Sequence, residues 1–252
     1  MILRVLLLGG TTEARHLAEQ LAADPDIAVT TSFAGRTTAP LSSGDVRVGG
    51  FGGVDGLVGW LRTHHIDAVI DATHPFATTI TANTVAATRE VSLPLLLLRR
   101  PGWPPRPDWH RVATQVDAVA RLPELGRRVF LTTGRTDLTI PAALPDLWFL
   151  LRSVHPPDEP PPNVTVVLGR GPFTVADELA LLRAHRVDVL VTRDSGGDTA
   201  KLDAARAHGI PVLVIERPAP PPDVPIVPTE VDATAWLRSV ASTAKNDTAD
   251  RD

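Results

Sequence analysis

The sequence predicts an α/β protein that folds into two lobes, each with a parallel β-sheet. Short apolar runs alternate with amphipathic stretches of helical period, which is the pattern of parallel strands joined by crossover helices. The chain has 252 residues, enough for two cores. A segment rich in proline and tryptophan, Arg99 to Trp109, continues neither a strand nor a helix. We therefore expect the first lobe at residues 1–100 and the second at residues 109–242.

The first lobe begins with a regular alternation of strands and helices. Strands are expected at 2–8, 27–33, 67–72 and 94–98, where the apolar runs are short, and helices at 12–22, 53–64 and 75–90. Pro75 suits the first position of the third helix, with Thr73 or His74 as the residue that caps it. Asp71, at the end of the third strand, is expected to be buried and hydrogen-bonded.

The second lobe repeats the same pattern without a clear internal sequence repeat. Strands are expected at 128–133, 147–154, 164–168, 187–192 and 211–216, and helices at 115–122, 174–186 and 199–208. The proline-rich stretches 155–162 and 217–228 indicate surface loops. The tail after about Ser242 is expected to fray.

Composition excludes several classes of function. With a net charge of −4 and a pI of about 6.1, the chain as a whole is not attracted to nucleic acid or to an anionic membrane. Without cysteine it has no disulfide, thiolate nucleophile or cysteine-bound metal, and its scattered histidines predict no metal site. The N-terminus lacks a basic segment followed by a long apolar run, so we expect a cytoplasmic protein.

The first strand runs into a Gly-Gly turn and a helix, as in many nucleotide sites. In a dinucleotide-binding turn, Gly9 and Ala14 fill the first and last places of the motif, but Thr11 occupies the middle glycine position. The N–H groups at the helix start still form an anion site, to which the hydroxyls of Thr11 and Thr12 can add. Arg15 faces the positive end of the helix dipole, which a bound anion would relieve. The alternative is an ordinary strand–turn–helix with a threonine cap.

The end of the second strand indicates which dinucleotide would bind. An NAD site places Asp or Glu there, about 20 residues after the glycine turn. This chain has Ser32, Arg36 and Thr37 instead, which are a cation and hydroxyls suited to a 2′-phosphate. The pattern therefore favours NADP over NAD, and a polar surface loop is the alternative.

The second lobe has two turns that resemble anion sites. The stretch from Val129 to Arg135 ends a strand with hydroxyls, glycine and a cation. Ser195 to Gly197 is suited to a concave nest of N–H groups, after which Asp198 would cap a helix that carries Lys201 in its first turn. A cation in that position again breaks the helix-dipole rule, and such violations tend to mark sites.

Four segments in this order and spacing, Gly9–Arg15, Asp71–Ala77, Thr132–Arg135 and Ser195–Lys201, resemble the precorrin-6A reductase family of cobalamin biosynthesis. The resemblance spans nearly the whole chain. It implies two Rossmann-like lobes with a cleft between them. It also implies that NADPH reduces one double bond of the precorrin-6A macrocycle to give precorrin-6B.

On this reading, the first lobe binds NADPH and the second lobe binds the carboxylates of a small-molecule substrate. The expected cofactor-binding residues are Gly9, Gly10, Thr11, Thr12, Glu13, Arg15, Ser32, Gly35, Arg36, Thr37, Thr73 and Pro75. The expected substrate-binding residues are Arg135, Ser195, Gly196, Gly197, Thr199 and Lys201. His74 and Lys201 are the catalytic candidates, and the proton source stays open among His74, Lys201, Asp137 and a bound water.

Two other functions fit the same glycine-rich turns. One is a methyltransferase that uses S-adenosylmethionine on a tetrapyrrole. The other is a non-catalytic module that binds NADP, against which the two separate anion turns of the second lobe argue.

Overall fold

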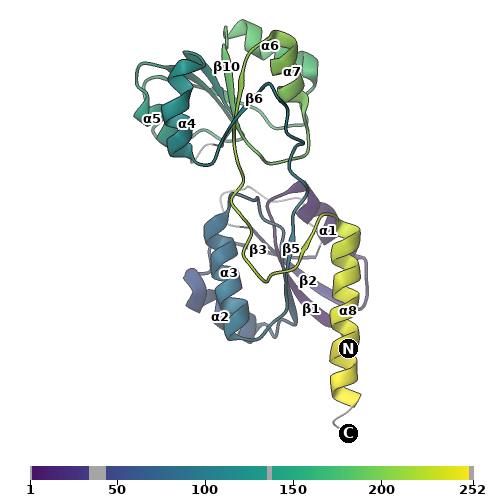
Figure 1. Cartoon of the computed structure of the whole chain (residues 1–252). Coiled ribbons are helices and arrows are strands. Elements are labelled where there is room, and N and C mark those ends of the chain that lie inside the picture. The colour runs from purple at the N-terminus through teal and green to yellow at the C-terminus, as the bar shows by residue number, and fades with distance from the viewer. Residues whose placement is uncertain (1, 34–43, 135–137, 250–252) are drawn as a thin grey trace. The chain divides into compact units, whose positions relative to one another are not determined.

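The computed structural model describes residues 2–33, 44–134 and 138–249, and it divides the chain into two compact units. One unit consists of Met1–Pro101 with Ala219–Asp252, and the other of Gly102–Pro218 (Figure 1). Each unit contains a six-stranded sheet in which every pairing is parallel. The predicted α/β class with two parallel sheets is therefore confirmed.

The first unit has the strand order β3-β2-β1-β4-β5-β12, which is the 3-2-1-4-5-6 order of a dinucleotide-binding sheet. Its strands are β1 (Leu3–Leu8), β2 (Ile27–Phe33), β3 (Asp45–Val48), β4 (Ala68–Asp71), β5 (Leu95–Leu98) and β12 (Ile226–Val227). Its helices are α1 (Thr12–Ala22), α2 (Gly53–Thr63), α3 (Thr78–Glu90) and α8 (Glu230–Ala249).

Helices cover both faces of this sheet, which explains why its central strands are continuous apolar runs. Val5 and Leu7 of β1 belong to the core shared with α1 and α8, whereas Leu6 and Leu8 belong to the core shared with α2 and α3. The order of strands reverses between β1 and β4, so the carboxyl ends of these two neighbours form the crevice where such sheets bind ligands.

The second unit has the equivalent order β9-β8-β7-β10-β11-β6. Its strands are β6 (Trp109–Val112), β7 (Arg128–Leu131), β8 (Trp148–Ser153), β9 (Val164–Leu168), β10 (Val189–Arg193) and β11 (Val212–Ile215). Its helices are α4 (Gln115–Arg121), the short 3-10 helix η1 (Leu122–Glu124), α5 (Thr139–Ala143), α6 (Val175–Ala184) and α7 (Ala200–His208). Helices α6 and α7 pack together on one face, and α4 packs with α5 (Figure 1).

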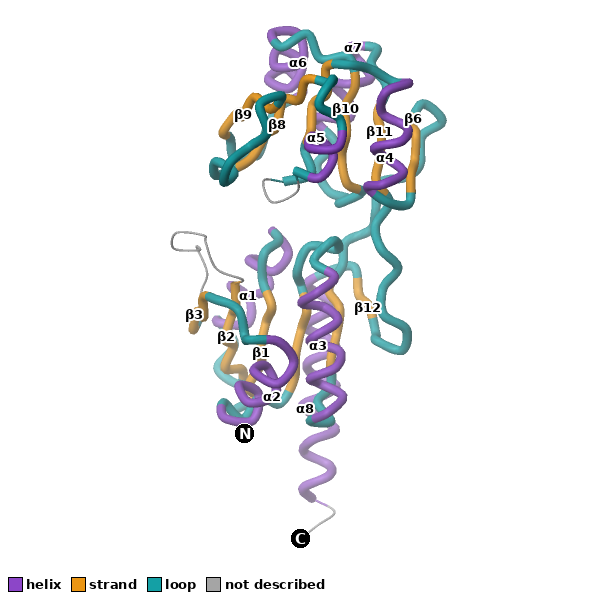
Figure 2. The backbone as a smooth tube through the Cα atoms, turned by 90° about the vertical axis from the view of Figure 1, so that its left-hand side faces the viewer, coloured by secondary structure: helices purple, strands orange, loops and turns teal. Residues whose placement is uncertain are grey.

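The edge strands β6 and β12 each belong to a different sheet from the strand that precedes them along the chain. After five strands of the first sheet, the chain enters the second unit and adds β6 beside β11 (Figure 2). After the second unit it returns, and β12 pairs with β5 through Ile226 and Leu97. Helix α8 then buries Ala233 and Leu237 in the core of the first unit. The structure therefore groups the chain from Ala219 onward with the first unit, whereas the sequence pattern placed residues up to 242 in the second lobe.

Several local features differ from the sequence-based expectations. The stretch 217–228, expected to be a surface loop, contains β12, and α8 continues beyond Ser242 to Ala249. The short elements β3, β6 and α5 were not expected, because none has a long periodic pattern of its own. Helix α8 (Glu230–Ala249) was not predicted either.

The predicted start of the third helix at Pro75 is wrong. Helix α3 begins at Thr78, and its N-cap is Ala77 rather than Thr73 or His74. The preceding residues form a turn instead, in which the N–H of Ala77 donates to the carbonyl of His74 over 2.8 Å. The side chain of Thr73 bonds to Asp71 and is therefore not available to cap the helix.

Candidate functional site

The turn between β1 and α1 is fixed by Thr11, which is the N-cap of the helix. Its hydroxyl accepts the N–H of Ala14 over 3.1 Å and donates to the carbonyl of Ala72, beyond the end of β4, over 2.9 Å. The predicted threonine cap is confirmed, and it ties the two strands at the order reversal together. The hydroxyl of Thr11 already donates one hydrogen bond and accepts another. An anion at this turn would therefore bind mainly to the backbone N–H groups at the start of the helix.

The two glycines of the turn have different roles. A Cβ atom on Gly9 would lie 2.9 Å from Cε1 of Phe33, so only glycine lets the end of β2 pack this closely. Gly10 has a φ of +139° and a Cβ there would meet no atom within 4 Å, so its backbone borders open space. Gly10 therefore leaves room for a ligand to approach the chain.

Glu13 lies in the first turn of α1 and pairs with Arg100, which follows β5, over 2.9 Å. Burial opposes the ionisation of Glu13. The hydrogen bond of its own backbone N–H, the charge and hydrogen bond of Arg100, and the hydroxyl of Thr11 outweigh burial, so the pKa of Glu13 lies below its ordinary value. Its carboxylate thus links α1 to the end of β5. Thr12 and Arg15 lie exposed in the same helical turn.

At the end of β4, Asp71 is 1% exposed, and its carboxylate accepts three hydrogen bonds. They come from the N–H of Thr73 at 3.0 Å, the hydroxyl of Thr73 at 2.6 Å and the hydroxyl of Thr81 at 2.6 Å. The prediction of a buried, hydrogen-bonded aspartate is confirmed. Asp71 shapes the turn that carries His74 and Pro75.

His74 is half-buried in that turn, and Pro75 is buried. The N–H of Phe76 lies 3.3 Å from Nδ1 of His74. A backbone donor at Nδ1 favours the neutral tautomer that carries its proton on Nε2. The ring is thereby set up to donate from Nε2.

A cation that the sequence reasoning missed lies at the carboxyl end of β2. Nη1 of Arg47, on β3, lies 3.4 Å from Oγ of the buried Ser32. Its guanidinium also donates to the carbonyls of Gly49 and Gly50 and lies 3.8 Å above the ring of Phe51. Burial lowers the pKa of Arg47 from its ordinary value. Gly35, Arg36 and Thr37, where the sequence placed the 2′-phosphate site, lie outside the described residues.

The second unit has a pocket of about 400 Å³ at the carboxyl ends of β7, β8 and β9, beside the start of α7. This size lies within the range of small-molecule sites. It is lined by Thr132, Gly134, Arg152, Ser153, Val154, His155, Gly169, Gly171, Phe173 and Lys201. The structure therefore brings Lys201 together with Thr132 and Gly134 of the turn after β7, whereas the sequence predicted two separate anion turns. Arg135 and Asp137 lie outside the described residues.

The turn Ser195–Gly197 only partly matches the predicted nest. Gly196 and Gly197 have φ angles of +67° and +76°, but the N–H of Ser195 donates to the carbonyl of Arg193 over 2.7 Å. That N–H is therefore already bonded within the protein. The carbonyl of Gly197 accepts Nε1 of Trp103 over 3.0 Å, which anchors the turn.

Helix α7 begins at Ala200 with Thr199, rather than the predicted Asp198, as its N-cap. Oδ1 of Asp198 accepts the N–H of Ala200 over 2.8 Å, and Lys201 lies in the first turn as predicted. The hydroxyl of Thr199 donates to Asp203 over 2.6 Å and, with Arg106, holds the pKa of Asp203 below its ordinary value against burial. Nζ of Lys201 lies 5.1 Å from the ring of Trp103, within the range of a cation–π contact. Ser195, Gly196, Gly197 and Thr199 are not among the described residues that line the pocket.

Residues 4–238 match the family model described as Precorrin-6x reductase CbiJ/CobK. The chain belongs to this family. The resemblance drawn from the four sequence segments is therefore confirmed.

Relatives within the precorrin-6x reductase family are similar over nearly their whole length. The chain is 54% identical over 240 residues to the precorrin-6A reductase of Rhodococcus erythropolis, covering 93% of this chain and 97% of that protein. It is 32% identical over 233 residues to the cobalt-precorrin-6A reductase of Salmonella typhimurium, covering 86% and 88%. The solved structure of CobK precorrin-6A reductase superimposes with a TM-score of 0.86 at 41% identity, covering 95% of this chain and 97% of that one.

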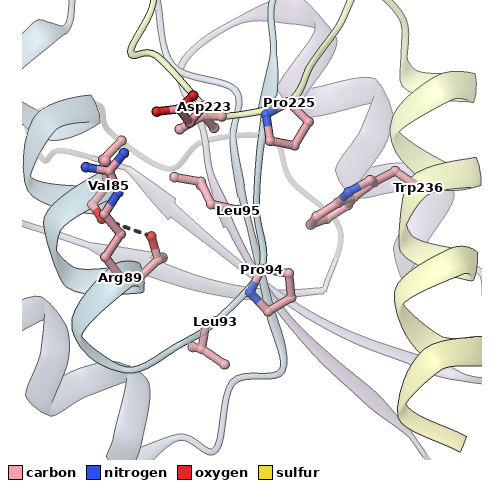
Figure 3. A pocket seen from close by; sticks show the side chains of 10 residues that line it. Val85, Arg89, Leu93, Pro94, Leu95, Asp223, Pro225 and Trp236 are labelled. Atoms are coloured by element: carbon pink, nitrogen blue, oxygen red, sulfur yellow. Dashed lines mark hydrogen bonds between the residues drawn. The ribbon is translucent and has the colours of Figure 1, made fainter. Parts of the chain in front are cut away.

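This member of the precorrin-6x reductase family has a further pocket of about 270 Å³ in the first unit (Figure 3). Its wall is formed by α3, the start of β5, the segment before β12 and Trp236 of α8. Because it lies at the amino end of β5, it is at the opposite edge of the sheet from the Gly9–Thr11 turn. We do not assign it to the cofactor.

Among the described residues, no helix is long and apolar enough to cross a membrane. Within the same part of the chain, no three histidine or acidic side chains are grouped so as to hold a metal ion.

Proposed function

We propose that the protein reduces one double bond of precorrin-6A with NADPH to give precorrin-6B in cobalamin biosynthesis. The observation that carries the proposal is the 49% to 54% sequence identity to precorrin-6A reductases over nearly the whole chain, with a solved precorrin-6A reductase that superimposes at a TM-score of 0.86. NADPH, when bound, supplies the hydride. The residues of this chain bind and orient both molecules and provide the proton.

The first unit has the features that NADPH binding requires. The Gly9–Thr11 turn lies at the reversal of strand order, and the open space at Gly10 lets a pyrophosphate approach the N–H groups that begin α1. Ser32 and Arg47 supply a hydroxyl and a cation at the end of β2, where the 2′-phosphate of NADPH would lie. Arg36 and Thr37 are expected to add to this subsite.

The second unit has the features that a substrate rich in carboxylates requires. Its pocket combines Arg152, His155 and Lys201 with the hydroxyl of Thr132 and the ring of Phe173. Cations and donors beside an aromatic surface suit a macrocycle with acidic side chains. The proton that accompanies the hydride is assigned to His74 or Lys201, with Asp137 and a bound water as the alternatives.

We further propose that the substrate is the cobalt-free precorrin. The chain is 43% to 54% identical to the precorrin-6A reductases compared with it, but only 27% to 32% identical to the cobalt-precorrin-6A reductases. The macrocycle differs in shape and charge at its centre when cobalt is bound. The higher identity to the precorrin-6A reductases therefore indicates that this protein binds the cobalt-free macrocycle.

The test is turnover of the purified full-length protein with precorrin-6A. NADPH oxidation is followed by the absorbance of the reduced nicotinamide, and the product is identified by mass. We expect one NADPH consumed per macrocycle, a mass gain of two hydrogens, and slower reaction with NADH or cobalt-precorrin-6A. Methyl transfer from S-adenosylmethionine, or binding of NADPH without its oxidation, would support the methyltransferase or the non-catalytic module instead.

A further inference from the structure

A buried ion pair lies in the wall of the second-unit pocket. Nη1 of Arg152, near the end of β8, donates to Oε1 of Glu178 on α6 over 2.7 Å, and the two side chains are 13% and 2% exposed. The other carboxylate oxygen, Oε2, is buried and has no hydrogen-bond partner among the described residues. Among the described residues, Arg152 is therefore the hydrogen-bond partner of the Glu178 carboxylate.

The guanidinium of Arg152 also lies beside two aromatic rings. Its Cζ lies 3.8 Å from the ring centre of Phe173 and 5.1 Å from that of Phe130. A Cβ atom on Gly169 would lie 3.3 Å from the Phe173 ring and 4.0 Å from Cδ of Arg152. Glycine in this turn thus leaves room for Phe173 beside the guanidinium, so the ion pair and the two rings hold Arg152 in position.

Stability alone does not account for this arrangement. Desolvation of two charges largely offsets their attraction, so a buried ion pair contributes little compared with apolar residues of the same volume. A guanidinium has five N–H donors, and the bond to Glu178 uses one of them. A fixed guanidinium on a pocket wall suits the two-point binding of a carboxylate.

The neighbouring side chains indicate the same ligand chemistry. His155 and Lys201 line the same pocket, and Nε2 of His155 is buried without a hydrogen-bond partner among the described residues. Three basic side chains on one pocket match a substrate with several carboxylates. We propose that Arg152 binds a carboxylate side chain of the substrate and that Glu178 and Phe173 position it. This inference rests on the proposed function.

Arg152→Lys is the main test, because lysine keeps a cation next to Glu178 but lacks the planar fork. We expect its KM for precorrin-6A to rise roughly ten- to hundredfold, as for a lost charge-assisted hydrogen bond, with a smaller change in kcat. Glu178→Gln keeps the shape but removes the positioning charge, so its KM should rise by a smaller factor. In both variants the Kd for NADPH, from nicotinamide fluorescence, should stay within about twofold of the wild type.

Arg128→Lys is the matched control. Arg128 also stacks on an aromatic ring, that of Trp148 at 4.0 Å, but it lies at the start of β7 and donates to the carbonyl of His185 at 2.9 and 3.0 Å. The KM of Arg128→Lys for precorrin-6A should equal that of the wild type. An unchanged KM in Arg152→Lys would overturn the proposal, and an unchanged KM in Glu178→Gln alone would remove only the positioning role.

The two proposals fail in different ways. A wild-type protein that does not oxidise NADPH with precorrin-6A contradicts the proposed function. Equilibrium titration with precorrin-6A, followed by its absorption spectrum, then tests Arg152 without turnover. Equal affinities of wild type and Arg152→Lys in that titration contradict the carboxylate assignment.

Discussion

If NADPH is the cofactor as proposed, single residues in the first unit should decide its preference over NADH. Arg47→Met keeps an aliphatic chain beside Phe51 but removes the cation near Ser32. We expect NADPH affinity to fall by about 1–3 kcal/mol, the value of a lost charge-assisted bond, while NADH affinity barely changes. Isothermal titration with both cofactors measures this. Equal losses for the two cofactors would place the 2′-phosphate elsewhere. Arg62→Met, which removes a cation paired with Glu90 on the surface, is the control.

The Glu13–Arg100 pair gives the first unit a defined pH dependence. The folded state lowers the pKa of Glu13 below its ordinary value of 4.5. The stability that Glu13 contributes is therefore complete above that ordinary value and disappears as the pH falls through the lower folded-state pKa. Urea unfolding should show wild type more stable than Glu13→Gln at neutral pH, with the difference shrinking in acid. A difference that grows as the pH falls would contradict the pairing.

At the scale of elements, the turn between β1 and α1 should matter more for binding than for folding. Gly10→Ala adds a methyl group in open space at a φ of +139°, which costs about 1–3 kcal/mol of strain and blocks the approach of a pyrophosphate. We expect at least a tenfold loss of NADPH affinity in a protein that still unfolds cooperatively. Gly209→Ala, at another positive φ with open space after α7, should lower stability without changing NADPH affinity. Equal NADPH affinities of Gly10→Ala and Gly209→Ala would contradict the assignment of the cofactor to the turn between β1 and α1.

Most elements with a long pattern of their own could be predicted from the sequence. The apolar runs of β1, β4, β5 and β10 and the cap at Thr11 depend on neighbouring residues, so the sequence alone identified them. The start of α3 was missed because Asp71 competes for the hydroxyl of Thr73. Arg47 was missed because the cation was sought directly after β2, at Arg36, whereas Arg47 lies on β3, the strand beside β2.

At the scale of the whole molecule, strand β12 makes the first unit depend on the C-terminal segment. A chain ending at Pro218 lacks β12 and α8, so β5 loses one of its two neighbouring strands and the core around α1 loses Ala233 and Leu237. We expect this variant to lose the cooperative unfolding of the first unit and its NADPH binding. Thermal unfolding with NADPH titration tests this. A chain ending at Thr243 keeps β12 and the buried Ala233 and Leu237, so it should bind NADPH like the wild type. NADPH binding by the chain that ends at Pro218 would show that the first unit does not depend on the C-terminal segment.

By itself, the sequence determined the α/β class, the two parallel sheets, the glycine turn after β1 and the family, because each can be recognised from short segments of neighbouring residues. Only the tertiary structure decided which sheet receives β6 and β12, and which side chains meet at the ends of the strands. Strand β12 has only two residues, which is too short a pattern to predict that it pairs with β5. The pairing of Arg152 with Glu178 joins a strand to a helix across 26 residues, so it exists only once sheet and helix have packed.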